Sequence, residues 1–165
     1  MVASLLALSV AACGTDTLDH PPGVAEVATM TADAAMSICE GRCGDKMVYV
    51  VDVLRDFGTP AGKEQPMPSA VRSAIAQALP GAVFVAQADL ADLFDDDFLV
   101  DGGDGVLVQV GAVQDLGSSV VGINAYVTTA RDGAYGETFA YAWDGSGWIP
   151  ATSDATDVPL TTVVS

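Results

Sequence analysis

A dense group of aspartates in the middle of the chain is the first candidate for chemistry. Seven aspartates fall between residues 89 and 104, with Gly102 and Gly103 among them and Gly105 directly after. Calcium takes six to eight oxygen ligands on flexible loops, so this composition suits it. The candidate ligands are Asp95, Asp97, Asp101 and Asp104. The spacing departs from the EF-hand pattern, and a solvated acidic loop is the alternative interpretation. Calcium is therefore a possible cofactor, and the sequence suggests no other.

A second candidate is an aromatic stripe around a single glutamate. Glu137 alternates with aromatic residues, and in a strand such residues share one face. Exposed, this face would form a platform for stacking sugar rings or apolar ligands, and Glu137 with an aspartate from 89–104 could act as a carboxylate pair in glycoside hydrolysis. Buried, the rings would be core beneath the helices. The candidate ligand-binding residues are Tyr135, Glu137, Tyr141 and Trp143.

Two cysteines, Cys39 and Cys43, are separated by Glu40-Gly41-Arg42. In an oxidising compartment such a pair predicts a disulfide that closes a small loop, and Gly41 permits the tight turn. The alternatives are a redox-active pair or free thiols. The CxxxC spacing differs from the CxxC of thioredoxin-like motifs.

Composition excludes several other classes of function. The chain has 165 residues, with 22 Asp and Glu against 6 Lys and Arg, a net charge of −16. This balance argues against nucleic-acid binding, which needs cations to displace counterions from phosphates, and against electrostatic docking on anionic lipid. The only histidine, His20, lies in a polar segment rich in proline and glycine, which cannot give a catalytic base fixed geometry. No P-loop or dinucleotide fingerprint is present.

The N-terminus carries the one resemblance to a known family. Residues 1–12 are uncharged and almost wholly apolar, and they are too short to span a bilayer. The segment Val10-Ala11-Ala12-Cys13 resembles the lipobox of bacterial lipoprotein precursors. This resemblance implies that a signal peptide is removed before Cys13 and that a diacylglycerol is joined to the Cys13 sulfur. The protein would then be exported and anchored in the cell membrane on the extracytoplasmic side.

The domain organisation follows from this resemblance. Residues 1–12 are expected to be the signal peptide, 13–23 the lipidated cysteine with a flexible tether, and 24–165 a single acidic domain. The tether assignment rests on polar and chain-breaking residues such as Pro21, Pro22 and Gly23.

Hydrophobic periodicity predicts the elements of the domain. Helical spacing runs from Val24 to Ile38 and again over Ala70–Leu79, where Ser69 is the expected N-cap. A short helix is possible within Asp89–Phe98. Val106–Leu116 begins a series of strand-like runs separated by turn residues, which predicts an antiparallel meander. The strand-like runs are 47–54, 82–86, 106–116, 120–130, 135–143, 148–152 and, as an edge strand, 158–164.

Together these observations predict an α+β fold, in which a mixed helix and strand half precedes a C-terminal antiparallel meander and the helices pack on one face of the sheet. The sequence favours a non-catalytic binding or envelope-associated module that contacts the membrane through its lipid anchor. Its protein or glycan partner is not specified by any motif. A carboxylate-dependent hydrolase of envelope sugars and a calcium-stabilised module are the alternatives.

Overall fold

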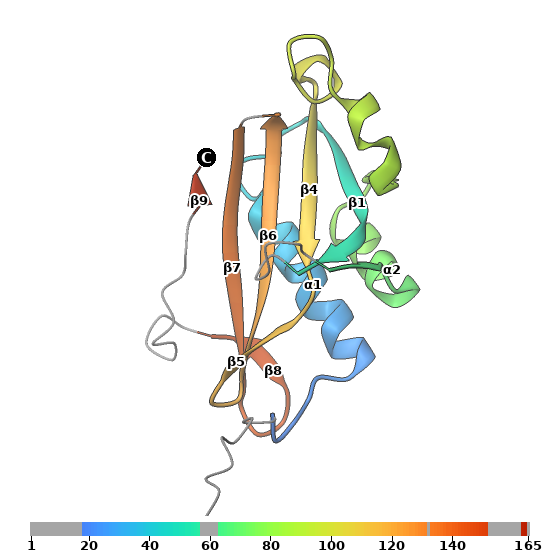
Figure 1. The fold of residues 1–165 in the computed structure, drawn as a ribbon. Coiled ribbons are helices and arrows are strands. Elements are labelled where there is room, and N and C mark those ends of the chain that lie inside the picture. Colours follow the sequence, from blue (N-terminus) through green and yellow to red (C-terminus); the bar gives the residue numbers. More distant parts are fainter. Residues whose placement is uncertain (1–17, 57–62, 132, 152–162, 165) are drawn as a thin grey trace, which may run out of the picture.

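The computed structural model describes residues 18–56, 63–131 and 133–151, together with the backbone of Val163 and Val164. It shows helices packed against one mixed β-sheet, which confirms the predicted α+β class (Figure 1). The strands are β1 (Met47–Arg55), β2 (Glu64–Pro66), β3 (Val83–Val85), β4 (Gly105–Gly111), β5 (Gln114–Gly117), β6 (Val120–Ala130), β7 (Gly133–Trp143), β8 (Trp148–Pro150) and β9 (Val163–Val164). The helices are α1 (Val24–Cys39), α2 (Ser69–Ala78) and the 3₁₀ helices η1 (Gln87–Leu93) and η2 (Asp101–Gly103).

The sheet is mixed: β1 has two parallel partners and one antiparallel partner, β2, and the strands beyond β4 are antiparallel. Its main order is β2-β1-β4-β6-β7-β8. β1 pairs in parallel with both β3 and β4, whereas β4, β6, β7 and β8 follow one another in antiparallel pairs. The predicted single strand 106–116 is wrong, because the chain leaves β4 after Gly111 and returns as β5, which pairs with β6. The antiparallel meander therefore begins at β5. β4 joins the two halves of the sheet, because it pairs in parallel with β1 and antiparallel with β6.

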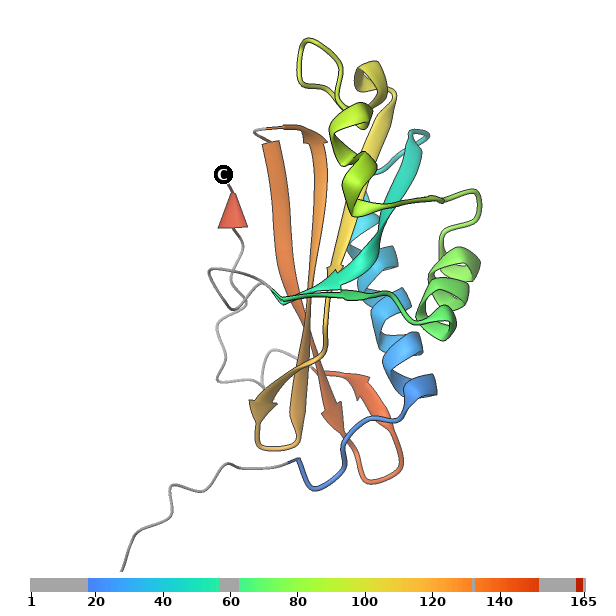
Figure 2. The ribbon, with the colours of Figure 1, turned by 45° about the vertical axis from the view of Figure 1, so that its right-hand side comes forward.

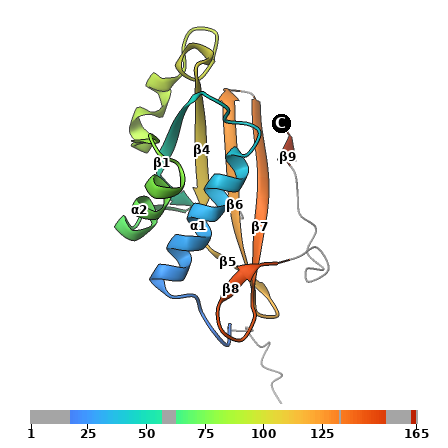
Figure 3. The same ribbon diagram turned by 180° about the vertical axis from the view of Figure 1, so that it is seen from behind.

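The two α-helices lie together on one face of the sheet. α1 crosses behind β4 and β6 in Figure 1, and the reverse view places α2 beside it toward the β1 edge (Figure 3). α1 approaches closely because Ala34 and Ala35 are fully buried and add little bulk. The main core lies between these helices and alternate residues of the central strands, among them Val106, Val108, Val121, Ile123 and Val127.

A smaller core covers the opposite face of β1 and β4. Val51, Val100 and Leu107 are buried there, and Leu90 and Leu93 of η1 pack against them. Figure 2 shows η1 beside β1. β1 therefore buries residues on both faces, as its unbroken apolar run predicts. The pairing of β1 with β4 has a register shift between Val50 and Leu54, and both of these residues belong to the main core.

The ends of the helices differ in detail from the sequence expectation. The predicted N-cap at Ser69 is wrong, since Pro68 is the N-cap and Ser69 is the first helical residue of α2. The proline ring fixes φ, which is −59° at Pro68, and the ψ of 144° keeps this residue outside the helix; it caps α2 without a side-chain hydrogen bond. α1 runs to Cys39, one residue beyond the predicted end. Its N-cap is Gly23, whose N–H donates to Glu26 Oε2 at 2.7 Å.

The β7–β8 hairpin matches the predicted turn. Asp144 Oδ1 accepts hydrogen bonds from the backbone N–H groups of Ser146 and Gly147 and from the Ser146 hydroxyl. These bonds, led by the one from the Ser146 backbone, hold the pKa of the Asp144 carboxyl below its usual range. Residue 152 of the predicted strand 148–152 and residues 158–162 of the predicted edge strand lie outside the described residues.

Candidate functional site

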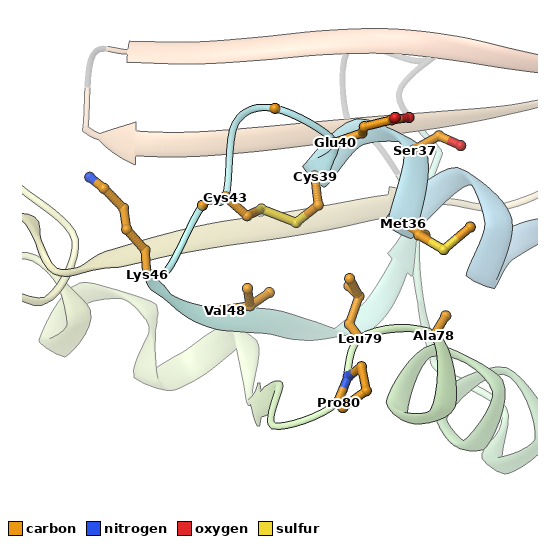
Figure 4. A pocket seen from close by; sticks show the side chains of 12 residues that line it. Met36, Ser37, Cys39, Glu40, Cys43, Lys46, Val48, Ala78, Leu79 and Pro80 are labelled. Atoms are coloured by element: carbon orange, nitrogen blue, oxygen red, sulfur yellow. A yellow bond between two sulfur atoms is a disulfide. The ribbon is translucent and has the colours of Figure 1, made fainter.

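A cleft of about 580 Å³ lies where the C-terminal ends of α1 and α2 meet the start of β1. Figure 4 shows it between the disulfide loop and the turn that leaves α2. One wall is apolar and the other carries the backbone of the loop and a few polar groups. The apolar lining is Met36, Val48, Ala78, Leu79, Pro80 and the two cysteines, and the remaining lining is Ser37, Glu40, Gly41, Gly44 and Lys46.

The predicted disulfide is present and forms part of this lining. Cys39 is the last residue of α1, and its bond to Cys43 closes the loop that follows the helix. Gly41 and Gly44 adopt positive φ values of 72° and 55°, which glycine allows without strain. Both cysteines are buried. The negative end of the α1 dipole disfavours a thiolate at this position, so the geometry fits a structural bridge better than a redox-active pair.

Arg42, inside the disulfide loop, completes the end of α1. Its guanidinium donates to the carbonyl oxygens of Ile38 and Glu40 at 3.4 and 3.3 Å and lies over the Tyr135 ring, 3.6 Å from its centroid. It thereby satisfies carbonyl groups that a helix end leaves free. Arg42 thus holds the disulfide loop against both α1 and β7, so this side of the cleft has a fixed position.

The predicted aromatic stripe lies on the helix-covered face of the sheet. Tyr135 and Phe139 pack against the main core, and Tyr141 is only 2% exposed. Glu137 accepts a hydrogen bond from the Tyr135 hydroxyl at 3.2 Å, and it does not line the cleft. This geometry matches the core interpretation and does not favour the sugar-cleaving one.

Tyr141 joins the stripe to α1. Its hydroxyl lies 3.0 Å from the Met30 carbonyl oxygen and 2.8 Å from Asp33 Oδ2. Burial, with a smaller contribution from the hydrogen bond to Asp33, raises the pKa of Tyr141 well above its usual value. The hydroxyl is therefore a neutral donor that positions α1 on β7.

The four candidate calcium ligands have separate positions in the loop before β4. Asp95 Oδ1 accepts the backbone N–H groups of Asp97 and Leu99, at 3.0 and 2.8 Å. Asp101 Oδ2 accepts the Tyr49 hydroxyl at 2.8 Å, and this bond raises the pKa of Tyr49. The Asp104 carbonyl accepts the Met47 N–H. Within the described residues, no three His, Cys, Asp or Glu side chains are grouped closely enough to hold a metal ion.

The last part of the predicted tether contacts the domain. Leu18 packs against the main core, and the His20 ring stacks on Trp143 with centroids 5.0 Å apart. Trp143 in turn meets the edge of Trp148. The polar composition of residues 14–23 gives no indication of this docking, because it depends on two tryptophans more than 120 positions away.

A smaller hollow of about 280 Å³ lies beside Trp148 and the first two turns of α1. The Nε1–H of Trp148 is buried and has no acceptor among the described residues. Ala25, Glu26, Thr29, Met30 and Gly147 complete the lining. Glu26 and Thr29 already bond to Gly23 and Ala25, so this hollow offers few groups to a ligand.

Comparison of the chain with protein-family models, with curated proteins and with solved structures finds no match. Among the described helices, none is both long and apolar enough to cross a membrane. The candidate site therefore rests on geometry. In the sequence, only the cysteine pair indicated this site. The packing of α2 on α1 adds Ala78, Leu79 and Pro80 to the lining, although they lie some 40 residues away in the chain.

Proposed function

We propose that this protein is a lipid-anchored extracytoplasmic binding module, without catalytic activity, that holds a small ligand in the cleft between the ends of α1 and α2. The observation that carries the proposal is the cleft itself, about 580 Å³ in volume and walled by the Cys39–Cys43 disulfide. Ligand pockets of proteins have volumes of roughly 300–1,000 Å³ and mainly apolar linings with a few polar groups. This cleft has both properties.

The proposed location rests on two supports. The segment Val10-Ala11-Ala12-Cys13 resembles a lipobox, and disulfides persist in oxidising compartments outside the cytoplasm. Neither support depends on the other, since one is a motif at the start of the chain and the other a covalent bond in the domain.

The geometry of α1 suits such an anchor. Only four residues separate Cys13 from Leu18, so a lipid on Cys13 would hold Leu18 within about 18 Å, at roughly 3.5 Å per residue. The start of α1 lies at one end of the domain, beside the β7–β8 hairpin (Figure 3). The 16 residues of α1 extend about 24 Å at 1.5 Å per residue, and the cleft lies at their far end. An anchored protein would therefore present its cleft away from the bilayer.

The anchoring is tested by expressing the full chain and a Cys13→Ala variant in a bacterium that processes lipoproteins. We expect the unaltered chain to lose residues 1–12, to gain the mass of a diacylglyceryl group and to partition into detergent. The variant should retain its N-terminus and gain no lipid. An unmodified Cys13 in the competent host would contradict the proposed anchoring.

The matched control uses the other two cysteines. In both proteins, Cys39 and Cys43 should react with an alkylating reagent only after reduction of the disulfide. The two proteins should agree, because Cys13→Ala changes the anchor and not the domain. Free thiols at these positions in the unaltered, lipidated protein would contradict the structural bridge.

A further inference from the structure

We propose that the cleft at the ends of α1 and α2 selects a small molecule with an apolar body and one protonated amine. This inference rests on the proposed function, because it names the class of ligand for the same cleft. It is carried by the arrangement of apolar side chains, helix ends and charged groups around the cavity.

The apolar body of such a ligand would lie against one continuous wall. Met36 from α1, Val48 from β1 and Leu79 and Pro80 after α2 converge on the cavity (Figure 4). Met36 is 47% exposed although it lies on the helix side of the sheet, where its neighbours Ala34, Ala35 and Ile38 are fully buried. An unbranched, polarisable methionine left exposed in a cleft adapts well to the shape of an apolar ligand.

The charge of the cavity comes first from the helices. α1 and α2 both end at it, and each helix end carries a partial negative charge on its free carbonyl groups. Neither helix has a basic residue in its last turn. Arg42 covers the carbonyl groups of Ile38 and Glu40 at the end of α1, whereas α2 ends in the uncharged sequence Gln77-Ala78-Leu79. Glu40 adds a full negative charge to the lining.

Lys46 is the one cationic side chain in the lining, and it is directed elsewhere. Its Nζ donates to the Gly103 carbonyl oxygen at 2.9 Å, and in Figure 4 the side chain leads away from Met36, Leu79 and Pro80. The net charge of −16 further disfavours an anionic ligand. A cationic head group beside the end of α2 and Glu40 is the complement of this environment.

The test compares three probes with one phenylpropyl body and different head groups, namely 3-phenylpropylamine, 3-phenylpropan-1-ol and 4-phenylbutyrate. The full chain is labelled with ¹³C at the methionine methyl groups, purified in a non-ionic detergent and titrated, with detergent alone as the blank. Met36 reports the cleft, and a Met36→Leu variant assigns its signal. Met47 and Met67 do not line the cleft and serve as internal references.

We expect the amine to shift the Met36 signal saturably and to leave the references unchanged. Its Kd should be about tenfold lower than that of the alcohol, since the uncovered end of α2 and the Glu40 carboxylate each favour a cation modestly. The carboxylate should bind weakest. Glu40→Gln should raise the Kd of the amine and not that of the alcohol, whereas Glu64→Gln, remote on β2, should change neither.

Two results would overturn the inference in different ways. Equal Kd values for amine and alcohol, or tighter binding of the carboxylate, would contradict the head-group selection while leaving the cleft as a binding site. A Met36 signal unchanged by all three probes would contradict the binding function as well. Neither result bears on the anchor, which the lipidation of Cys13 tests separately.

Discussion

At the scale of single residues, Tyr141 shows how one buried polar group ties a helix to the sheet. Its hydroxyl reaches Met30 and Asp33 of α1 from a position near the C-terminal end of β7. The folded state raises the pKa of Tyr141, so it favours the neutral phenol. The resulting stabilisation is fully present below the unfolded pKa of about 10 and is lost as the pH rises above it, because the unfolded chain then releases the proton more readily.

We therefore expect Tyr141→Phe to lower the free energy of unfolding at neutral pH by about 1–2 kcal/mol. The variant should also lose less stability than the unaltered protein between about pH 9 and pH 11. Urea denaturation at a series of pH values measures both effects. An identical alkaline decline in the two proteins would show that another group causes it.

Gly136 of β7 is restricted to glycine by Tyr126, its pairing partner on β6. A methyl group at Gly136 would lie 2.2 Å from a Tyr126 ring carbon, closer than any real contact. We expect Gly136→Ala to destabilise the fold by about 1–3 kcal/mol, because the ring must move. Gly147→Ala is the matched control, since no atom lies within 4 Å of its added carbon. Thermal unfolding of both variants is the measurement, and equal melting temperatures would contradict the prediction.

At the scale of elements, the acidic loop before β4 has a structural explanation for part of its aspartate content. Asp95 closes the segment to Leu99 through two backbone N–H groups. The loop also places Phe98 at a φ of 61°, a left-handed conformation that costs energy for a bulky residue, with Arg131 over its ring. Such a loop needs local bonds to keep its shape.

We expect Asp95→Ala to lower the stability by about 1 kcal/mol through the loss of these bonds. Asp97→Ala should have a smaller effect, because Asp97 contributes its backbone N–H to the same arrangement and alanine retains it. Chemical denaturation with and without calcium distinguishes the two roles of the loop. Calcium that raises the stability of the unaltered chain and not of Asp95→Ala would support the metal prediction, since a ligand of the folded state must stabilise it.

At the scale of the whole molecule, the net charge of −16 is a cost to the compact state. Like charges are brought together on folding, and dissolved salt screens their repulsion over about 10 Å at 0.1 M. We expect the melting temperature to rise with sodium chloride between about 10 mM and 0.5 M. Scanning calorimetry at fixed pH measures it, and a flat or falling curve would show that the charges are arranged in favourable pairs.

The local elements could be predicted because each depends on neighbouring residues. The alanine-rich period of α1, the β-branched run of β1 and the Asp144–Gly147 turn all specify structure within one segment. β2 was missed, because its sequence Glu64-Gln65-Pro66 has no strand signal of its own and is extended through pairing with β1. The break between β4 and β5 was missed for a similar reason, since continuous apolar character does not reveal where a chain changes partner.

By itself the sequence determined the α+β class, the acidic surface and the cysteine pair that forms the disulfide, because composition, periodicity and short spacing are local properties. Only the tertiary structure decided which face of β7 is buried, how β4 joins the parallel and antiparallel halves, and that α1 and α2 end at a shared cleft. These features depend on contacts between residues far apart in the chain. A periodic pattern shows that a face must be buried, and packing decides against what.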